Sequence, residues 1–252
     1  MQNLAEKVVM VTGGSTGIGR ATSCILAAAG ARVVIADVQD EEGAETVEMI
    51  AAAGGQSEFH HVDVTSPEQV ESLIAGIVRD WGKLDGAFNN AGIEGDSAKL
   101  HKCSMENWHR VIAVNLTGVF VCMQYELQQM LKQQSGAIVN TASAAGLVGI
   151  IGANAYSAAK HGVVGITKTA AAEYAASGIR VNAVCPGFID TPMLGRVSDI
   201  GKEHLARMVD SVPARRIAQP SEIGDAVAWL LSEQSSYVNG VPMPVDGGWV
   251  AV

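Results

Sequence analysis

The N-terminal segment of the chain joins an apolar run, a glycine-rich turn and a helical pattern without interruption. Residues 7–12 read as a buried strand, and Gly13, Gly17 and Gly19 follow directly. From about residue 17 to residue 29, apolar side chains recur at helical spacing, and Gly30 is a helix stop. A strand that passes through a tight turn into a helix is the first part of a βαβ unit. The sequence therefore predicts an α/β fold built on a parallel sheet.

The glycine turn also has the composition of a phosphate site. Glycines let the backbone bend tightly, leave room for a pyrophosphate and aim helix amides at it. The order G-x-x-x-G-x-G departs from the usual G-x-G-x-x-G fingerprint, so an ordinary glycine turn is the alternative interpretation. A second strand, residues 32–36, ends at Asp37, where a carboxylate accepts hydrogen bonds from both adenosine ribose hydroxyls and repels a 2′-phosphate. The turn and Asp37 together predict NAD as the cofactor.

Tyr156 and Lys160 stand four residues apart in a segment that reads as a helix. At this spacing the two side chains share one helix face. A tyrosine with a pKa of ~10 is a poor base near neutral pH, and a neighbouring ammonium stabilises its phenolate. The pair therefore indicates an acid/base unit for an alcohol, although tyrosine and lysine at this spacing also occur by chance.

The ordered motifs of the chain resemble those of the short-chain dehydrogenase/reductase family, in its compact NAD-dependent type. The resemblance rests on Thr12-Gly13 through Gly19, Asp63-Val64, Asn89-Asn90-Ala91-Gly92, Asn115, Ser143, Tyr156 with Lys160, and Pro186-Gly187 with Thr191. It implies one domain over residues 1–252, a single-domain Rossmann fold with a doubly wound parallel sheet of about seven strands flanked by helices. The cofactor-binding residues that it implies are Gly13, Ser15, Gly17, Ile18, Gly19, Asp37, Asp63, Val64, Asn90, Ala91, Gly92, Tyr156, Lys160, Pro186, Gly187, Ile189 and Thr191.

The same resemblance implies four catalytic residues. Tyr156 takes the alcohol proton in oxidation and returns it in reduction, and Ser143 hydrogen-bonds the substrate oxygen. Lys160 lowers the pKa of Tyr156 and binds the nicotinamide ribose, and Asn115 holds a water that relays protons to solvent. Two of these residues have plainer interpretations. Ser143 lies in a loop of small residues, and an asparagine at position 115 also satisfies buried backbone.

The substrate is the least constrained part of the prediction. Residues 188–212 are too long for a simple crossover and resemble the substrate lid of the family. The side chains expected to line an apolar pocket are Phe188, Met193, Leu194, Val197, Leu205 and Met208, with Leu147, Val148, Ile150 and Ile151. They favour a neutral secondary alcohol or ketone, cyclic compounds included. Arg196, Lys202 and Arg207 leave open an acidic substrate.

Composition limits the partners. A formal net charge of −9 disfavours nucleic acid and anionic membranes. No apolar run is long enough to span a bilayer, and the first residues resemble no export signal, so we expect a cytoplasmic protein. The four cysteines form no C-x-x-C pair, and no four-ligand set predicts a metal. Small residues on the helix after Lys160 and the apolar C-terminal stretch 241–252 predict a homotetramer.

Two other functions stay open at this point. A binding or scaffold protein would keep the fold and the cofactor without turnover, against which the complete set of four catalytic residues argues. A ketoacyl reductase would need an NADP site, which Asp37 without a following arginine disfavours. An epimerase or dehydratase of the extended relatives is excluded, because the roughly sixty residues after Thr191 leave no room for their substrate domain.

Overall fold

The computed structural model describes residues 4–198 and 202–252. For residues 196–198 and 202–205 it describes the backbone only. It contains a seven-stranded sheet in the order β3-β2-β1-β4-β5-β6-β7, with every pair parallel. The strands are β1 (Val8–Thr12), β2 (Arg32–Asp37), β3 (Gln56–His61), β4 (Gly86–Asn89), β5 (Gly136–Thr141), β6 (Ile179–Pro186) and β7 (Pro242–Val245). The sheet confirms the predicted doubly wound fold.

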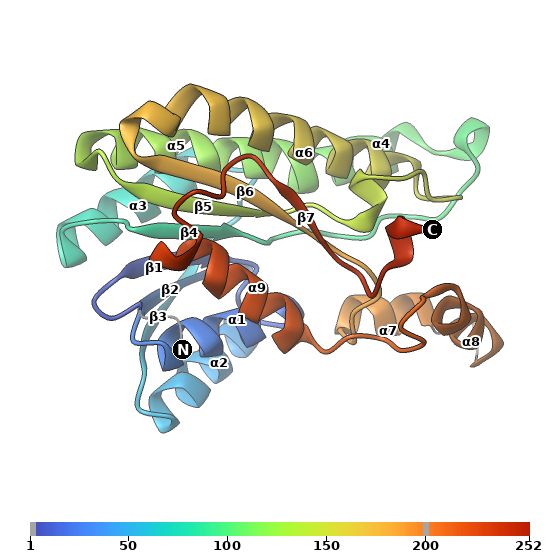
Figure 1. Cartoon of the computed structure of the whole chain (residues 1–252), viewed down its shortest axis with the longest axis horizontal. Helices are drawn as coiled ribbons and strands as arrows, with labels where there is room; N and C mark the ends of the chain where they lie inside the picture. The colour runs from blue at the N-terminus through green and yellow to red at the C-terminus, as the bar shows by residue number, and fades with distance from the viewer. Residues whose placement is uncertain (1–3, 199–201) are drawn as a thin grey trace.

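Helices cover both faces of this sheet, as Figure 1 shows. On one face lie α3 (Pro67–Trp81), α4 (Met105–Ile112), α5 (Val119–Gln133) and α6 (Asn154–Tyr174), and on the other α1 (Gly17–Ala28), α2 (Asp40–Ala52) and α9 (Pro220–Leu231). Alternate residues of each strand enter opposite cores: Met10 joins the core under α5 and α6, and Val11 the core under α1 and α9. A parallel sheet covered on both faces needs such continuous apolar strands.

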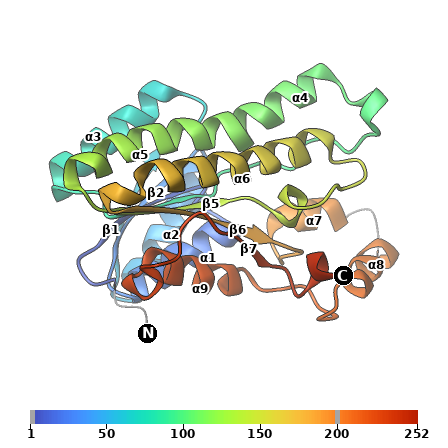
Figure 2. The ribbon, with the colours of Figure 1, turned by 45° about the horizontal axis from the view of Figure 1, so that its top comes forward.

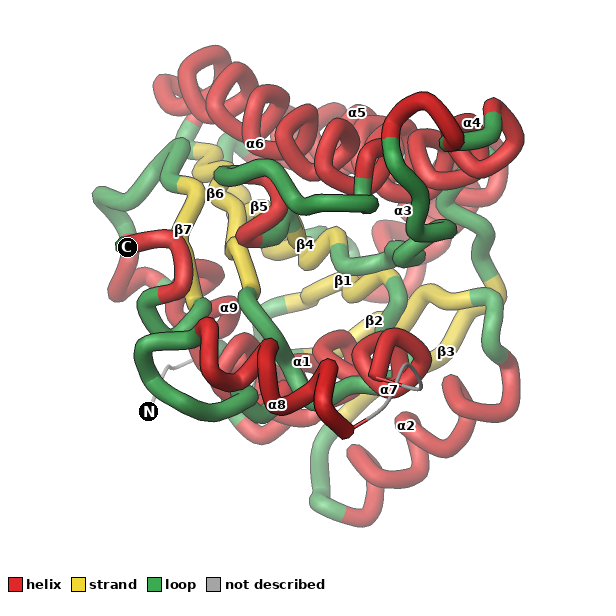
Figure 3. Tube along the Cα trace, turned by 90° about the vertical axis from the view of Figure 1, so that its right-hand side faces the viewer, coloured by secondary structure: helices red, strands yellow, loops and turns green. Residues whose placement is uncertain are grey.

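The strand order reverses direction between β1 and β4, because β2 and β3 extend the sheet one way and β4 to β7 the other. The connections that leave the carboxyl ends of β1 and β4 therefore lead to helices on opposite faces of the sheet. In open α/β sheets the crevice that binds ligands lies outside the carboxyl ends of the strands at such a reversal point, so we expect the cofactor there. Figure 3 looks at these carboxyl ends, with α7 (Pro192–Ser198) and α8 (Lys202–Ser211) in front of them.

Two local details concern residues of the predicted site. β3 ends at His61, so Asp63 and Val64 lie in the loop after the strand. Asn115 lies in a long helical stretch, of which residues Ala113–Gly118 form a π-helical segment between α4 and α5. A π-helical segment within an α-helix is frequent at functional sites.

No helix among the described residues has the length and apolarity needed to cross a membrane.

A buried polar chain links the four elements β4, β5, α5 and α6. The Glu126 carboxyl accepts a hydrogen bond from Asn89 Nδ2 at 3.0 Å, and the same nitrogen donates to Asn140 Oδ1 at 3.0 Å. Asn140 Nδ2 in turn donates to Thr167 Oγ1 at 2.9 Å. Glu126 is fully buried, and burial raises the pKa of its carboxyl to about 8, which the Asn89 hydrogen bond opposes only in part. The folded protein therefore holds a neutral carboxylic acid in its core at neutral pH.

This carboxyl makes the stability of the fold depend on pH. Its folded pKa lies above its ordinary value of 4.5, so its stabilising contribution is complete below that pH and is lost as the pH rises toward 8. Between about pH 5.5 and about pH 8 we expect the free energy of unfolding to fall by about 3 kcal/mol more in the parent than in Glu126→Gln. Equilibrium urea unfolding at both pH values measures this, and an identical pH dependence in both proteins would contradict it.

Candidate active site

The glycine turn after β1 is held tightly against the start of α1. Gly13 and Gly17 have positive φ angles of 63° and 52°, which glycine adopts without strain. A Cβ on Gly19 would lie 1.9 Å from the carbonyl oxygen of Gly13, and a Cβ on Gly13 would lie 2.8 Å from Cα of Ala91. Larger residues at these positions would therefore break the turn or push it away from the loop after β4.

Hydrogen bonds join this turn to the loop after β4. Thr12 Oγ1 accepts from the backbone nitrogens of Asn90 and Ala91 at 3.0 and 3.2 Å, and Asn90 Nδ2 donates to the Gly13 carbonyl at 3.0 Å. From the β5 side, Thr141 Oγ1 donates to Asn90 Oδ1 at 3.4 Å. The predicted residues Gly13, Asn90 and Ala91 thus meet at the reversal point of the sheet.

Asp37 lies at the end of β2, beside the glycine turn. Its carboxylate accepts hydrogen bonds from the backbone of Ser15 at 3.0 Å and of Val38 at 2.8 Å, and its side chain is almost fully buried. The two arginines nearest in sequence are engaged elsewhere. Arg20 bonds the Ser15 carbonyl and pairs with Glu45, and Arg32 sits at the opposite end of β2. The structure therefore shows a carboxylate beside this turn and both arginines directed to other partners.

The remaining predicted cofactor residues surround the same crevice. Ser15 Oγ is buried and finds no hydrogen-bond partner among the described residues, next to a turn where added Cβ atoms would collide. A Cβ on Gly17 would lie 3.2 Å from the Thr191 side chain, so the glycine turn faces the segment after β6. The others lie in or next to the loops at this edge, or at the start of α1: Ile18, Gly19, Asp63, Val64, Gly92, Pro186, Gly187 and Ile189. The arrangement fits a dinucleotide that runs across the carboxyl ends of the strands.

Tyr156, Ser143 and Lys160 come together where β5 meets α6. The Ser143 side chain is near enough to Tyr156 to lower the pKa of its phenol. The Ser143 oxygen accepts from the Ala145 nitrogen at 3.1 Å, which fixes its direction. Lys160 Nζ donates to the Thr141 carbonyl at 2.7 Å and lies 5.6 Å from the centroid of the Tyr156 ring. The structure thus brings a phenol, a hydroxyl and an ammonium to one point at the edge of the crevice.

The ionisation of this group differs from the expectation that Lys160 lowers the pKa of Tyr156. Burial raises the pKa of the Tyr156 phenol, the Ser143 hydrogen bond opposes that, and the Glu94 carboxylate raises it further. Burial also lowers the pKa of the Lys160 ammonium to about 8. The reason for the difference is geometric, because the ammonium donates to a backbone carbonyl rather than to the phenol.

Asn115 belongs to the π-helical segment and is fully buried. Its Oδ1 accepts from the Ile93 nitrogen at 2.8 Å, and its Nδ2 donates to the Ile93 carbonyl at 2.7 Å. The side chain therefore satisfies buried backbone, as the plainer interpretation of the sequence expected. It also fixes the loop after the Asn-Asn-Ala-Gly motif, on the side where the substrate would bind. The water relay assigned to Asn115 stays a prediction.

The segment expected to be a lid forms α7 and α8, beyond the carboxyl ends of the strands (Figure 2). Its start and its end are both attached to the C-terminal turn. The Phe188 ring packs against Trp249 with centroids 5.2 Å apart, and the Ala214 nitrogen donates to the Gly247 carbonyl at 3.1 Å. Ile151 and Val148 are exposed at the loop after Ser143. The side chains of Arg196, Val197, Lys202 and Leu205 lie outside the described residues.

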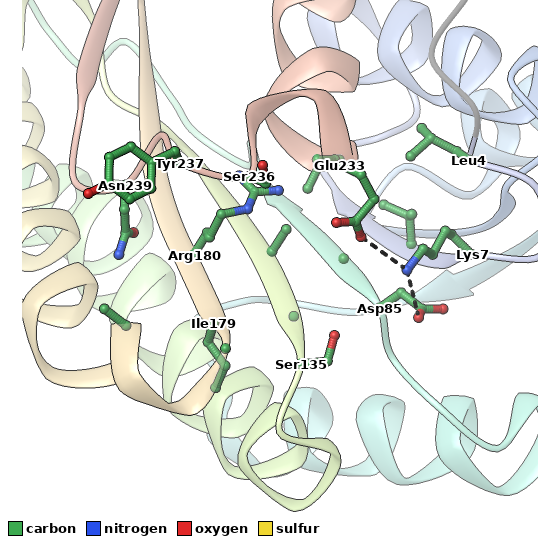
Figure 4. A pocket seen from close by; sticks show the side chains of 17 residues that line it. Leu4, Lys7, Asp85, Ser135, Ile179, Arg180, Glu233, Ser236, Tyr237 and Asn239 are labelled. Carbon is green, nitrogen blue, oxygen red and sulfur yellow. Dashed lines mark ion pairs between the residues drawn. The ribbon is translucent and has the colours of Figure 1, made fainter.

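A cavity of about 480 Å³ opens at the opposite, amino-terminal ends of the strands (Figure 4). Its two cations are already engaged by the protein. Lys7 pairs with Asp85 at 3.6 Å and Glu233 at 3.7 Å, and Arg180 donates to the carbonyls of Leu230 and Ser232. This cavity lies away from Tyr156 and contains none of the predicted site residues.

Among the described residues, no group of three or more His, Cys, Asp or Glu side chains could hold a metal ion.

Two residues of the site were not found from the sequence. Thr141 bonds the Asn90 side chain, and Glu94 acts on the phenol of Tyr156. Thr141 is the last residue of β5, so its position at a strand end is the signal that could have found it. Glu94 is a charged residue two positions after the Asn-Asn-Ala-Gly motif, and only the folded chain shows that it faces the catalytic group.

Comparison with known proteins supports the reading of this geometry. A family model described as enoyl-(acyl carrier protein) reductase matches residues 13–250. The chain is 43% identical to 2,5-dichloro-2,5-cyclohexadiene-1,4-diol dehydrogenase of Sphingobium indicum, covering 100% of both chains. It is also 43% identical to cyclohexanol dehydrogenase of an Acinetobacter strain, over 98% of this chain and 96% of the relative.

Solved structures of similar proteins superpose closely on this chain. Levodione reductase superposes with a TM-score of 0.96 at 38% identity, covering 98% of this chain and 99% of the other. NAD⁺-bound xylitol dehydrogenase superposes with a TM-score of 0.93 at 34% identity, covering 98% and 100%. With the fold, the ordered motifs and these matches, the chain belongs to the short-chain dehydrogenase/reductase family, which is a family of oxidoreductases.

Proposed function

We propose that the protein is an NAD-dependent oxidoreductase that interconverts a neutral secondary alcohol and its ketone. The observation that carries the proposal is the meeting of Ser143, Tyr156 and Lys160 next to the glycine turn and the loops at the carboxyl ends of the strands. Relatives named for cyclic alcohols and a cyclic ketone support a cyclic substrate. A scaffold role without turnover is disfavoured, because the complete set of four expected catalytic residues is retained.

The residues divide the chemistry among them. When bound, NAD⁺ accepts the hydride at its nicotinamide ring. Tyr156 receives the hydroxyl proton as phenolate, and Ser143 holds the substrate oxygen in line with the phenol. Lys160 orients the nicotinamide ribose and, as a nearby cation, favours the phenolate in the assembled site. Because the protein atoms alone raise the pKa of Tyr156, alcohol oxidation should speed up as the pH rises above neutral.

Three further features belong to this proposal. Residues 188–212 act as a substrate lid within a single domain of residues 1–252. The C-terminal turn holds both ends of this lid. The enzyme works as a homotetramer in the cytoplasm, with the small-residue face of α6 in one interface. NAD is preferred over NADP because Asp37 faces the adenosine ribose, which also disfavours a ketoacyl reductase.

Removing the phenol oxygen tests the acid/base assignment. In Tyr156→Phe we expect kcat for alcohol oxidation to fall at least about a hundredfold, with little change in NAD affinity. Tyr237→Phe is the matched control, since that tyrosine is fully exposed at the other end of the strands. Steady-state kinetics with a panel of secondary alcohols and NAD binding by fluorescence titration measure both effects. Activity retained within about threefold would show that Tyr156 is not the acid/base.

Cofactor preference tests the position of Asp37. We expect the parent to favour NAD over NADP in kcat/KM by about a hundredfold or more, because a 2′-phosphate would meet this carboxylate. Asp37→Ala combined with Val38→Arg should erode or reverse that preference, whereas Asp40→Ala, an exposed carboxylate on α2, should leave it intact. Equal use of both cofactors by the parent is the result that would place the carboxylate away from the ribose.

The mass of the protein in solution tests the proposed homotetramer. Exposed apolar residues such as Phe120 on α5 and Met105 on α4 lie on the helices expected to meet a second subunit. We expect light scattering at micromolar concentration to give the mass of a tetramer. A monomer mass would contradict this.

A further inference from the structure

The phenol of the proposed acid/base group stands in the first turn of α6. The helix begins at Asn154, so Tyr156 is its third residue, and Lys160 lies about one turn further on. The residue before the helix is Ala153, which makes no side-chain capping hydrogen bond. The first turn of a helix has backbone N–H groups without a partner in the helix, and helix ends fray when nothing else holds them. The position of the phenol therefore depends on contacts made from outside α6.

These contacts come from the backbone of Ala98. Its nitrogen donates to the Gly152 carbonyl at 3.0 Å, and Asn154 Nδ2 donates to the Ala98 carbonyl at 2.6 Å. Ala98 and Ala153 are also paired as an isolated parallel bridge. The Asn154 amide is therefore a side-chain link between the first turn of α6 and the segment that contains Ala98.

The segment that receives this hydrogen bond is itself fixed by two other asparagines. Asn115 holds the backbone of Ile93 through two hydrogen bonds. Asn107 on α4 holds the backbone of Asp96 in the same manner, with Oδ1 accepting from its nitrogen at 2.8 Å and Nδ2 donating to its carbonyl at 3.4 Å. α4 lies beside α6 on this face of the sheet (Figure 2). The Asn154 hydrogen bond thus ties the first turn of α6 to a segment that is already held in place.

The two side chains beside the phenol are held by other parts of the chain. Ser143 Oγ accepts from the Ala145 nitrogen at 3.1 Å, and Lys160 Nζ donates to the Thr141 carbonyl at 2.7 Å. Neither hydrogen bond involves the first turn of α6. A shift of that turn would therefore change the distance from the phenol to both side chains. Catalysis depends steeply on such distances, and a displacement of about 1 Å can lower the rate by about a hundredfold.

We propose that Asn154 is a positioning residue, whose hydrogen bond to the Ala98 carbonyl sets the place of the Tyr156 phenol. The inference rests on the proposed role of Tyr156 as acid/base. Asn154 takes no part in the proton transfer. Its loss leaves the glycine turn and Asp37, which are expected to hold the cofactor, unchanged, and it lets the phenol leave the position from which it takes the hydroxyl proton. The rate of the chemical step therefore falls, and cofactor binding does not.

Removal of the amide tests this role. In Asn154→Ala we expect kcat for the best substrate in a panel of secondary alcohols to fall about tenfold, with the Kd of NAD⁺ within about twofold of the parent. Asn154→Gln keeps an amide donor and should recover most of the lost rate. Asn239→Ala is the matched control, because Asn239 Nδ2 donates to the Ala171 carbonyl at 3.0 Å, near the other end of the same helix. It should keep kcat within about twofold.

Stability and turnover together separate positioning from a general loss of structure. Urea unfolding measures the stability of both alanine variants, and kcat is compared at a temperature at which both are folded. An equal loss of kcat in the two alanine variants would overturn the proposal. An NAD⁺ affinity that falls as much as kcat, or an Asn154→Gln variant as slow as Asn154→Ala, would overturn it too.

The same assays distinguish this proposal from the proposed function. If the parent oxidises no alcohol of the panel, the proposed function fails and the role of Asn154 fails with it. If the parent is active and Tyr156→Phe is not, but Asn154→Ala keeps kcat within about twofold, only the role of Asn154 fails.

Discussion

A parallel sheet covered by helices on both faces can expose polar groups only at the ends of its strands. That constraint decides where chemistry is possible in this chain. Residues such as Val11 and Met10 enter dry cores on either side of β1, and the next residues, Thr12 and Gly13, are the first that bond to the loop after β4. The reversal of strand order between β1 and β4 then opens the crevice at which the site residues converge.

Close backbone contact is the second requirement of the site. The glycine turn approaches both its own helix and the loop after β4 so closely that side chains at Gly13 or Gly19 would collide with backbone. This contact joins the glycine turn to the loop that carries Asn90. Asn115 then fixes the same loop at Ile93 through two hydrogen bonds. The segments expected to hold the cofactor are therefore fixed relative to one another.

The sequence predicted the strands, the glycine turn, Asp37 and the acid/base pair, because each has a local signature in spacing or periodicity. It did not predict contacts between residues that only the folded chain brings together. The Lys160 ammonium bonds the Thr141 carbonyl, and the Glu94 charge acts on Tyr156, although no pattern along the chain links either pair. Glu126 illustrates the same limit, since its position on α5 reads as a surface position until α5 and α6 cover it.

The attachment of the 188–212 segment to the C-terminal turn has a consequence for how the enzyme can be altered. Trp249 packs on Phe188 before α7, and Gly247 bonds Ala214 after α8, so the last residues of the chain contact both ends of one segment. A substitution at Trp249 or Gly247 would therefore act on the segment that carries α7 and α8 through contacts that lie outside that segment.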